Sequence, residues 1–182
     1  INQGGVYTVT ATSPTTGCTT SKTISVSESE LALLGYDDIT VYDLTGDGTN
    51  RIEIQTGVDN LGIGDYEFAF NDGSFQDSPV FEDVEPGIHK ISVKDKNGCG
   101  IAEIMVSVIG YKYFFTPSSD GINDTWQVLG ISEQFQAESL IYIFDRHGRL
   151  LTQIATDSEG WDGTYNGSAL PADDYWFRVN LE

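Results

Sequence analysis

The sequence predicts an all-β chain built from tandem immunoglobulin-like β-sandwich domains. Short stretches in which apolar and polar residues alternate recur along the 182 residues, as they do in half-buried strands. Twenty glycines, several of them next to Asn or Asp, supply the tight turns that join such strands. A pattern of strands and turns also recurs after about 80 residues, a length that suits one immunoglobulin-like sandwich per unit.

Residues 1–28 are expected to be the last hairpin of an upstream immunoglobulin-like repeat. Residues 6–11 alternate between apolar and polar types, residues 14–17 supply a turn, and residues 24–26 resume a strand. The sequence does not begin with a charged segment and an apolar core, so no signal peptide is recognised there. We expect Ile1 to lie within a longer polypeptide.

The next unit, residues 29–109, is predicted to be one complete immunoglobulin-like repeat of about seven short strands. The clearest strand patterns cover residues 39–42, 52–54, 66–70, 87–93 and 104–108, with Gly-containing turns between several of them. The last two of these strands match the hairpin of residues 1–28 in spacing and residue type, which indicates a tandem repeat.

The two cysteines, Cys18 and Cys99, occupy equivalent places in consecutive units. They are therefore about one domain length apart, whereas a disulfide requires Cα atoms about 4.4–6.8 Å apart, so mutual pairing is not expected. Cys99 is predicted to be a buried free thiol.

The last unit, residues 110–182, contains three motifs. Residues 114–126 form a loop rich in Ser, Asp and Gly between aromatic residues, and residues 141–151 form two apolar arms around a polar turn. Residues 160–177 combine a Trp-containing tight turn with an aromatic strand. Gly110 marks the start of this unit, and no Gly/Ser-rich linker precedes it, so we expect it to abut the repeat stiffly.

In this order, the three motifs resemble the gliding-motility-associated C-terminal domain, the type B sorting domain of the type IX secretion system of Bacteroidota. Two features differ from that family. Ser118 and Ser119 stand where the family usually has Asn-Gly, and the family usually adds one more strand after the position of Glu182. The preceding units resemble, in less detail, the SprB-like immunoglobulin-like repeats of Bacteroidota surface adhesins.

The resemblance implies that residues 110–182 are a folded signal for export through the type IX secretion system and for anchoring there. The whole protein would be a large secreted adhesin of the gliding-motility type. It would cross the periplasm and reach the cell surface in association with the outer membrane. The implied partners are the type IX translocon and an outer-membrane protein of the PorP/SprF type. Two alternatives are a β-sandwich module that binds carbohydrate or protein, and a row of passive stalk domains.

Charge and composition exclude several classes of function. The formal net charge is −19, from 9 basic and 28 acidic residues, so the chain repels nucleic acid and anionic lipid surfaces. Direct membrane insertion is not expected, because a span needs about 20 largely apolar residues and the longest apolar region, residues 101–115, contains charges. Neither histidine lies beside a nucleophile, and the carboxylates lie in open turns, so we expect no catalytic residues and no enzyme activity.

The residues expected to contact a partner, or to define the recognised shape, are mostly Gly, Asp and aromatic residues of the three motifs. They are Phe115, Thr116, Pro117, Asp120, Gly121, Asn123, Asp124, Trp126, Asp145, Arg146, Gly148, Trp161, Asp162, Gly163, Tyr175 and Trp176. Positions of these types can equally serve folding alone. The tryptophans could instead form a sugar-stacking platform, but a small domain needs such rings, which bury about 150–250 Å² each, for its core.

Calcium is a possible ligand, and no other cofactor is expected. Asp120, Asn123 and Asp124 place oxygen donors around a glycine, as calcium loops do, and residues 43–50 have a similar composition. Neither stretch completes an EF-hand loop. The simpler interpretation is that these short side chains accept hydrogen bonds from their own backbone and hold the turns.

Overall fold

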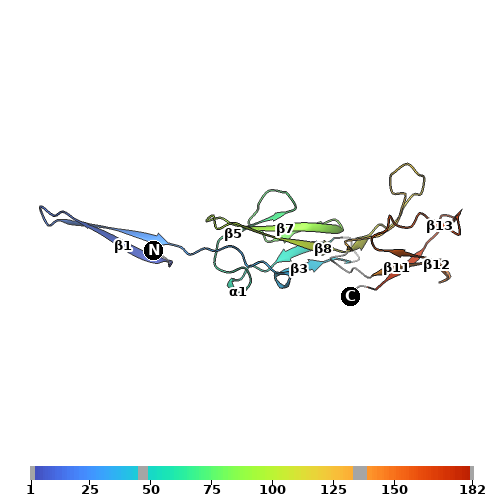
Figure 1. Ribbon diagram of the computed structural model, residues 1–182, viewed down its shortest axis with the longest axis horizontal. Helices are drawn as coiled ribbons and strands as arrows, with labels where there is room; N and C mark the ends of the chain where they lie inside the picture. Colours follow the sequence, from blue (N-terminus) through green and yellow to red (C-terminus); the bar gives the residue numbers. More distant parts are fainter. Residues whose placement is uncertain (1–2, 45–48, 133–138, 181–182) are drawn as a thin grey trace.

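The computed structural model describes residues 3–44, 49–132 and 139–180 of the chain. Nearly all regular structure in these residues is antiparallel β-sheet, which confirms the predicted all-β class. Three groups of strands follow one another along the longest axis of the molecule (Figure 1). No helix in the described residues has the length and hydropathy to cross a membrane.

The first group is a single antiparallel hairpin of β1 (Gly5–Thr12) and β2 (Thr19–Val26), which projects at one end of the molecule (Figure 1). The hairpin predicted for this stretch is therefore confirmed. Its apolar side chains are exposed, Val9 and Ile24 among them. An isolated two-stranded hairpin is marginally stable at best in water.

The middle group consists of two three-stranded antiparallel sheets. One sheet contains β3 (Ile39–Tyr42), β4 (Arg51–Ile54) and β6 (Val80–Phe81). The other contains β5 (Tyr66–Phe70), β7 (Gly87–Asp95) and β8 (Ile101–Val108). A 3₁₀ turn, η1 (Tyr36–Asp38), precedes β3, and the one-turn helix α1 (Val58–Leu61) follows β4. All five strand patterns named from the sequence in this unit are strands.

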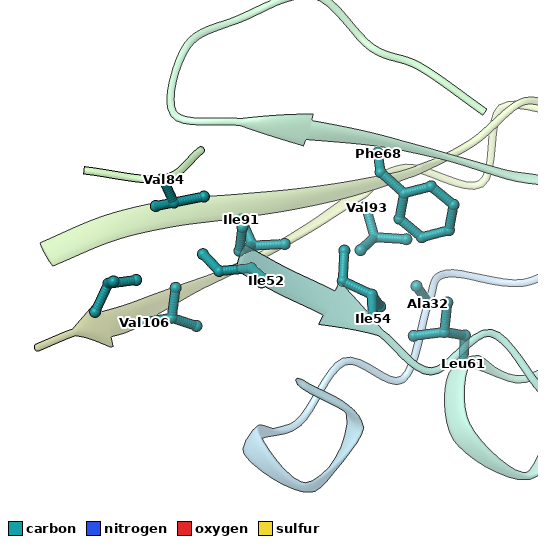
Figure 2. Close-up of a cluster of buried hydrophobic side chains, with 10 residues drawn as sticks. Ala32, Ile52, Ile54, Leu61, Phe68, Val84, Ile91, Val93 and Val106 are labelled. Atoms are coloured by element: carbon teal, nitrogen blue, oxygen red, sulfur yellow. The ribbon is translucent and has the colours of Figure 1, made fainter. Parts of the chain in front are cut away.

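The two sheets of the middle group share one apolar core, drawn in Figure 2. Ile52 and Ile54 of β4 and Ile91 and Val93 of β7 are at most 2% exposed. These residues occupy every second position of their strands, so one face of each sheet supplies the core. The apolar positions that alternate in the sequence of β4 and β7 are therefore the positions that face the core.

The middle group departs from the sequence prediction in its strand count. Within its described residues there are six strands, β3 to β8, where about seven were expected. Between β5 and β6, the chain pairs with β5 at a single isolated bridge, between Phe68 and Gln76, and forms no further strand there. Asp72, Gly73 and Pro79 lie on either side of this bridge, and such residues do not favour a longer ladder.

The third group contains three small sheets. The first pairs β9 (Gly110–Tyr111) with β10 (Val128–Leu129). The second has β11 (Leu140–Phe144) between β12 (Leu150–Ala155) and β15 (Trp176–Val179). The third is the hairpin of β13 (Thr164–Tyr165) and β14 (Ser168–Ala169). The predicted hairpin around residues 141–151 and the predicted aromatic strand at the end are both confirmed.

The middle and third groups are in direct contact around Ile109. Its backbone N–H donates to Oδ2 of Asp43 at 2.7 Å, and its side chain packs against the core of the third group. A Cβ on Gly110 would lie 2.3 Å from Cγ of Pro86, so this position has no room for a side chain. Ser107 of β8 donates its hydroxyl to the carbonyl of Gly130. These contacts join the two groups at the point where the chain passes between them.

Both cysteines are free, and both are exposed. The prediction that Cys99 is a buried thiol is therefore wrong. Cys99 lies in the turn between β7 and β8, where its Sγ lies 3.2 Å from the carbonyl oxygen of Ser29. The turn is held by polar contacts at the end of the sheet, outside the apolar core, so the thiol stays accessible.

Candidate functional site

The first and third sequence motifs of the third group meet at a backbone bridge between Trp126 and Trp161. Each residue donates its N–H to the carbonyl of the other, at 2.9 and 2.8 Å. Both side chains are buried, at 8% and 5% exposure. Their indole N–H groups donate to the carbonyls of Lys112 and Thr164. The bridge thereby fixes two residues more than 30 positions apart in the sequence to one another.

Phe115 and Tyr175 complete the aromatic cluster around Trp161. The ring centroid of Phe115 lies 5.4 Å from that of Trp161, and the ring centroid of Tyr175 lies 5.0 Å from it. The hydroxyl of Tyr175 donates to the carbonyl of Pro171 at 2.6 Å. Burial raises the pKa of this hydroxyl, and the carboxylates of Asp173 and Asp145 act in the same direction. Such packed aromatic pairs stabilise a small core beyond the area they bury.

The loop of the first motif is organised by the carboxylate of Asp124. One of its oxygens accepts the backbone N–H groups of Ser118 and Ser119, at 2.8 and 2.6 Å, and the other accepts that of Gly121 at 2.7 Å. These bonds, that of Gly121 first, hold the pKa of Asp124 below its usual range. The loop closes with the N–H of Thr116 donating to the carbonyl of Asn123. Asp124 thus accepts hydrogen bonds from the backbone of its own turn, as the simpler interpretation of the sequence expected.

The calcium candidates use their oxygens within the loop. Besides Asp124, Asp120 accepts the N–H of Ile122 at 2.8 Å, and Oδ1 of Asn123 accepts Nζ of Lys112 at 2.8 Å. No group of three or more His, Cys, Asp or Glu side chains that could hold a metal occurs in the part of the chain that the structure describes. The other calcium candidate, residues 43–50, includes residues 45–48, which lie outside the described part.

The turn of the second motif has the same construction. Oδ1 of Asp145 accepts the backbone N–H groups of His147 and Arg149, both at 2.9 Å. These bonds, that of Arg149 first, hold the pKa of Asp145 below its usual range. Gly148 adopts a φ of 81°, a conformation that suits glycine. Arg146 points outward and lies 3.5 Å from a carboxylate oxygen of Asp173.

The turn after Trp161 fits closely against the first motif. Gly160 and Gly163 have φ values of 98° and 77°. A Cβ on Gly160 would lie 2.6 Å from the carbonyl oxygen of Trp126, and one on Gly163 would lie 3.3 Å from the ring of Phe115 and 3.4 Å from Pro117. The conformation at both positions favours glycine, and at Gly160 the carbonyl oxygen of Trp126 also leaves no space for a side chain.

Asp162 lies on the exposed side of the same turn. Its Oδ1 accepts the hydroxyl of Thr164 at 2.8 Å and the N–H of Thr164 at 2.9 Å. The hydroxyl above all holds the pKa of Asp162 below its usual range. The three motif carboxylates, Asp124, Asp145 and Asp162, each accept backbone N–H groups of their own turns, as in Asx turns.

The aromatic candidates fall into two sets. Trp126 and Trp161 are buried and Phe115 and Tyr175 are partly buried, whereas Trp176 is 65% exposed. The buried indoles cannot stack with Trp176 on one flat sugar-binding surface. Of these aromatic candidates, Trp176 therefore offers the most surface to a partner.

Trp176 belongs to an exposed face that the sequence did not single out. It pairs across the sheet with Phe144, and Phe144 pairs in turn with Leu150. In the next row, Tyr142 pairs with Arg178. In the sequence, residues 140–144 are apolar at every position, so the pattern does not distinguish the core face from the outer face. The register of three strands is needed to place these residues together.

The family model of the CHU_C type IX secretion signal domain matches residues 109–182. The matched region is the third group of strands, which contains all three motifs. No curated protein and no solved structure matches the chain. The family match supports a C-terminal sorting signal for type IX secretion, which implies interaction with that machinery and export to the cell surface or the extracellular space. A secretion signal domain is not an enzymatic family.

Proposed function

We propose that residues 110–182 are a folded signal for export through the type IX secretion system and for anchoring at the outer membrane. The carrier would be a large cell-surface adhesin of the gliding-motility type from a member of the Bacteroidota. The observation that carries the proposal is the match of the secretion signal domain to residues 109–182. The direct partners would be the translocon and an outer-membrane protein of the PorP/SprF type, met after passage through the periplasm.

The proposed mechanism is recognition of a folded surface, with no bond made or broken. Hydrogen bonds to Asp124, Asp145 and Asp162 fix the conformation of each turn. The bridge between Trp126 and Trp161 fixes the first motif to the third. Because the surface is already ordered, docking immobilises little additional chain and loses little conformational entropy. In this proposal, most of the candidate residues define the recognised shape.

We also propose that residues 1–28 and 29–109 belong to a row of immunoglobulin-like repeats that precedes the signal at 110–182. The support is that the two hairpins pair their strands in an equivalent way. Gly5 pairs with Val26 in the hairpin of β1 and β2, and Gly87 pairs with Val108 in β7 and β8. Both pairs lie at the open ends of their hairpins, and β7 and β8 belong to one of the two sheets around the core of the middle group. The exposed hairpin would belong to a similar pair of sheets.

The test joins the chain to a reporter protein that is directed to the periplasm of a bacterium with a type IX secretion system. The fusion with the whole chain should deliver the reporter to the cell exterior. The matched fusion with residues 1–109 alone should leave it in the periplasm. Cell fractionation and protease access to intact cells measure both. Equal delivery by the two fusions would contradict the proposal, because the signal would then lie outside residues 110–182.

A further inference from the structure

We infer that the turn of Asn166 and Gly167 is a site of spontaneous deamidation, and that the fold selects it over the other Asn-Gly pair of the chain, Asn97 and Gly98. The modification replaces the neutral side-chain amide of Asn166 with a carboxylate, as aspartate or isoaspartate. Water is the only co-reactant. The inference goes beyond the proposed function and does not depend on it.

The chemistry is the same at any Asn-Gly pair. The backbone nitrogen of the glycine, after losing its proton, attacks Cγ of the asparagine, and the bond between Cγ and Nδ2 breaks, so that ammonia leaves. The product is a succinimide ring. Water then opens the ring at one of its two carbonyl carbons, which gives either aspartate or isoaspartate, in which the main chain runs through Cγ. Glycine favours the attack because no side chain obstructs its nitrogen.

Asn166 and Gly167 form the two-residue turn of the hairpin of β13 and β14. Their φ values of 51° and 77° both lie in the left-handed region, as in the type I′ turns of two-residue hairpins. Both residues are exposed, and a Cβ on Gly167 would meet nothing within 4 Å. Among the residues that the structure describes, neither the side chain of Asn166 nor the N–H of Gly167 has a hydrogen-bond partner.

The rate of the reaction depends on how readily this turn opens. The backbone of a tight turn must rearrange before the glycine nitrogen can reach Cγ, so local opening precedes the chemical step. β13 and β14 have two residues each and form a sheet of their own. Because a two-stranded hairpin is marginally stable at best in water, opening of this turn costs little free energy.

The pair of Asn97 and Gly98 is equally exposed but is held at the end of a sheet. Nδ2 of Asn97 donates to Oγ of Ser29 at 3.1 Å and to Oδ1 of Asp95 at 3.3 Å. The N–H of Gly98 donates to the carbonyl of Asp95 at 3.1 Å. Asp95 is 1% exposed and ends β7, which pairs with β5 and β8. Opening of this turn must break these hydrogen bonds, so the fold protects Asn97.

Isoaspartate at position 166 would loosen the hairpin that supports Trp161. It adds a carbon atom to the main chain of the two-residue turn, which disrupts the pairing of Tyr165 with Ser168. Thr164 belongs to the adjacent pair of the hairpin, and its carbonyl accepts the indole N–H of Trp161 at 2.9 Å. The modification would therefore weaken the third motif from its exposed end.

The experiment incubates the purified whole chain in mildly alkaline buffer and follows both sites over time by peptide mass spectrometry. Trypsin releases residues 97–112 and 150–178 as separate peptides, and each contains a single asparagine. Asn166 should deamidate about tenfold faster than Asn97, because the additional hydrogen bonds at Asn97, one of them to a carboxylate, lower the population of its open turn. In urea the two sites should react at comparable rates, because only the fold distinguishes them.

Two variants test the physical cause. Ser29→Ala removes a hydroxyl that holds Asn97 and should accelerate deamidation of Asn97 without changing that of Asn166. Asn166→Gly suits the left-handed conformation and cannot deamidate, so its Tm should stay constant during the incubation while that of the unmodified chain falls. Deamidation of Asn97 as fast as that of Asn166 in the folded chain would overturn the inference. So would an Asn166 that reacts only in urea, or an unchanged rate at Asn97 in Ser29→Ala.

Discussion

Single side chains determine the conformation of the turns in the third group of strands. Asp124, Asp145 and Asp162 each accept backbone N–H groups of their own turn, so these three candidate residues hold the conformation of their turns. Among the described residues of this group, Ser119, Asn123 and Asn166 have a positive φ without being glycine. Asparagine adopts this conformation more readily than serine does. The φ of Ser119 is 61°, in the left-handed region where a side chain is strained, and this residue stands where the resembling family usually has Gly.

The first prediction is that Ser119→Gly stabilises the protein. Glycine removes the steric cost of the left-handed conformation, partly offset by its greater freedom in the unfolded chain, which leaves a gain of about 0.5–1 kcal/mol. The matched control is Ser118→Gly, because Ser118 does not have a positive φ and gains nothing in conformation. Urea unfolding measures both free energies. A Ser119→Gly variant no more stable than Ser118→Gly would contradict the strain at this position.

At this scale the sequence did not distinguish the buried candidate residues from the exposed ones. It placed Trp126, Trp161 and Trp176 in one set of candidates. The structure buries the first two and exposes the third, because burial depends on which strand face meets the core of a partner sheet. Local sequence does not contain that information where, as in residues 140–144, both faces of a strand are apolar.

At the scale of elements, one buried carboxylate ties the segment before β3 to the turn between β7 and β8. Asp95, at the end of β7, is 1% exposed and accepts the hydroxyl of Ser29 and the backbone N–H of Cys99. The Ser29 hydroxyl above all, followed by the N–H and thiol of Cys99 and the contact with Asn97, holds the pKa of Asp95 well below its usual range.

This contact predicts a loss of stability in acid. Because the pKa is lower in the folded chain, the contribution of Asp95 is complete above the unfolded pKa of about 4 and is lost as the pH falls below it. Asp95→Asn should lower the Tm at pH 7 and flatten its fall between about pH 4 and pH 2. The exposed Asp37→Asn serves as the control and should keep the acid dependence. An unchanged acid dependence in Asp95→Asn, followed by circular dichroism, would contradict the assignment.

The longer strands were predictable because alternation and Gly-containing turns are local signals. The hairpins of residues 1–28 and 141–151 and the strands at 39–42 and 66–70 follow from them. The short elements were not predictable. β6, β9 and β10 have two residues each and exist because a distant strand lies beside them. The exposed position of Cys99 likewise follows from the contact of its turn with Ser29, 70 residues earlier in the chain.

At the scale of the whole molecule, three groups of strands lie in a row, and the region matched by the secretion signal domain is the last of them (Figure 1). The sequence predicted this order from its repeat and its motifs. It did not predict how the middle and last groups meet, because the contacts of Ile109 with Asp43 and of Gly110 with Pro86 join residues distant in sequence.

The most direct test of the central claim is the location of the whole-chain reporter fusion in two isogenic hosts, one with an intact type IX translocon and one without it. If this machinery recognises the folded domain, the reporter should be found at the cell exterior in the first host and in the periplasm in the second. Delivery to the exterior in both hosts, or retention in the periplasm in both, would contradict the account.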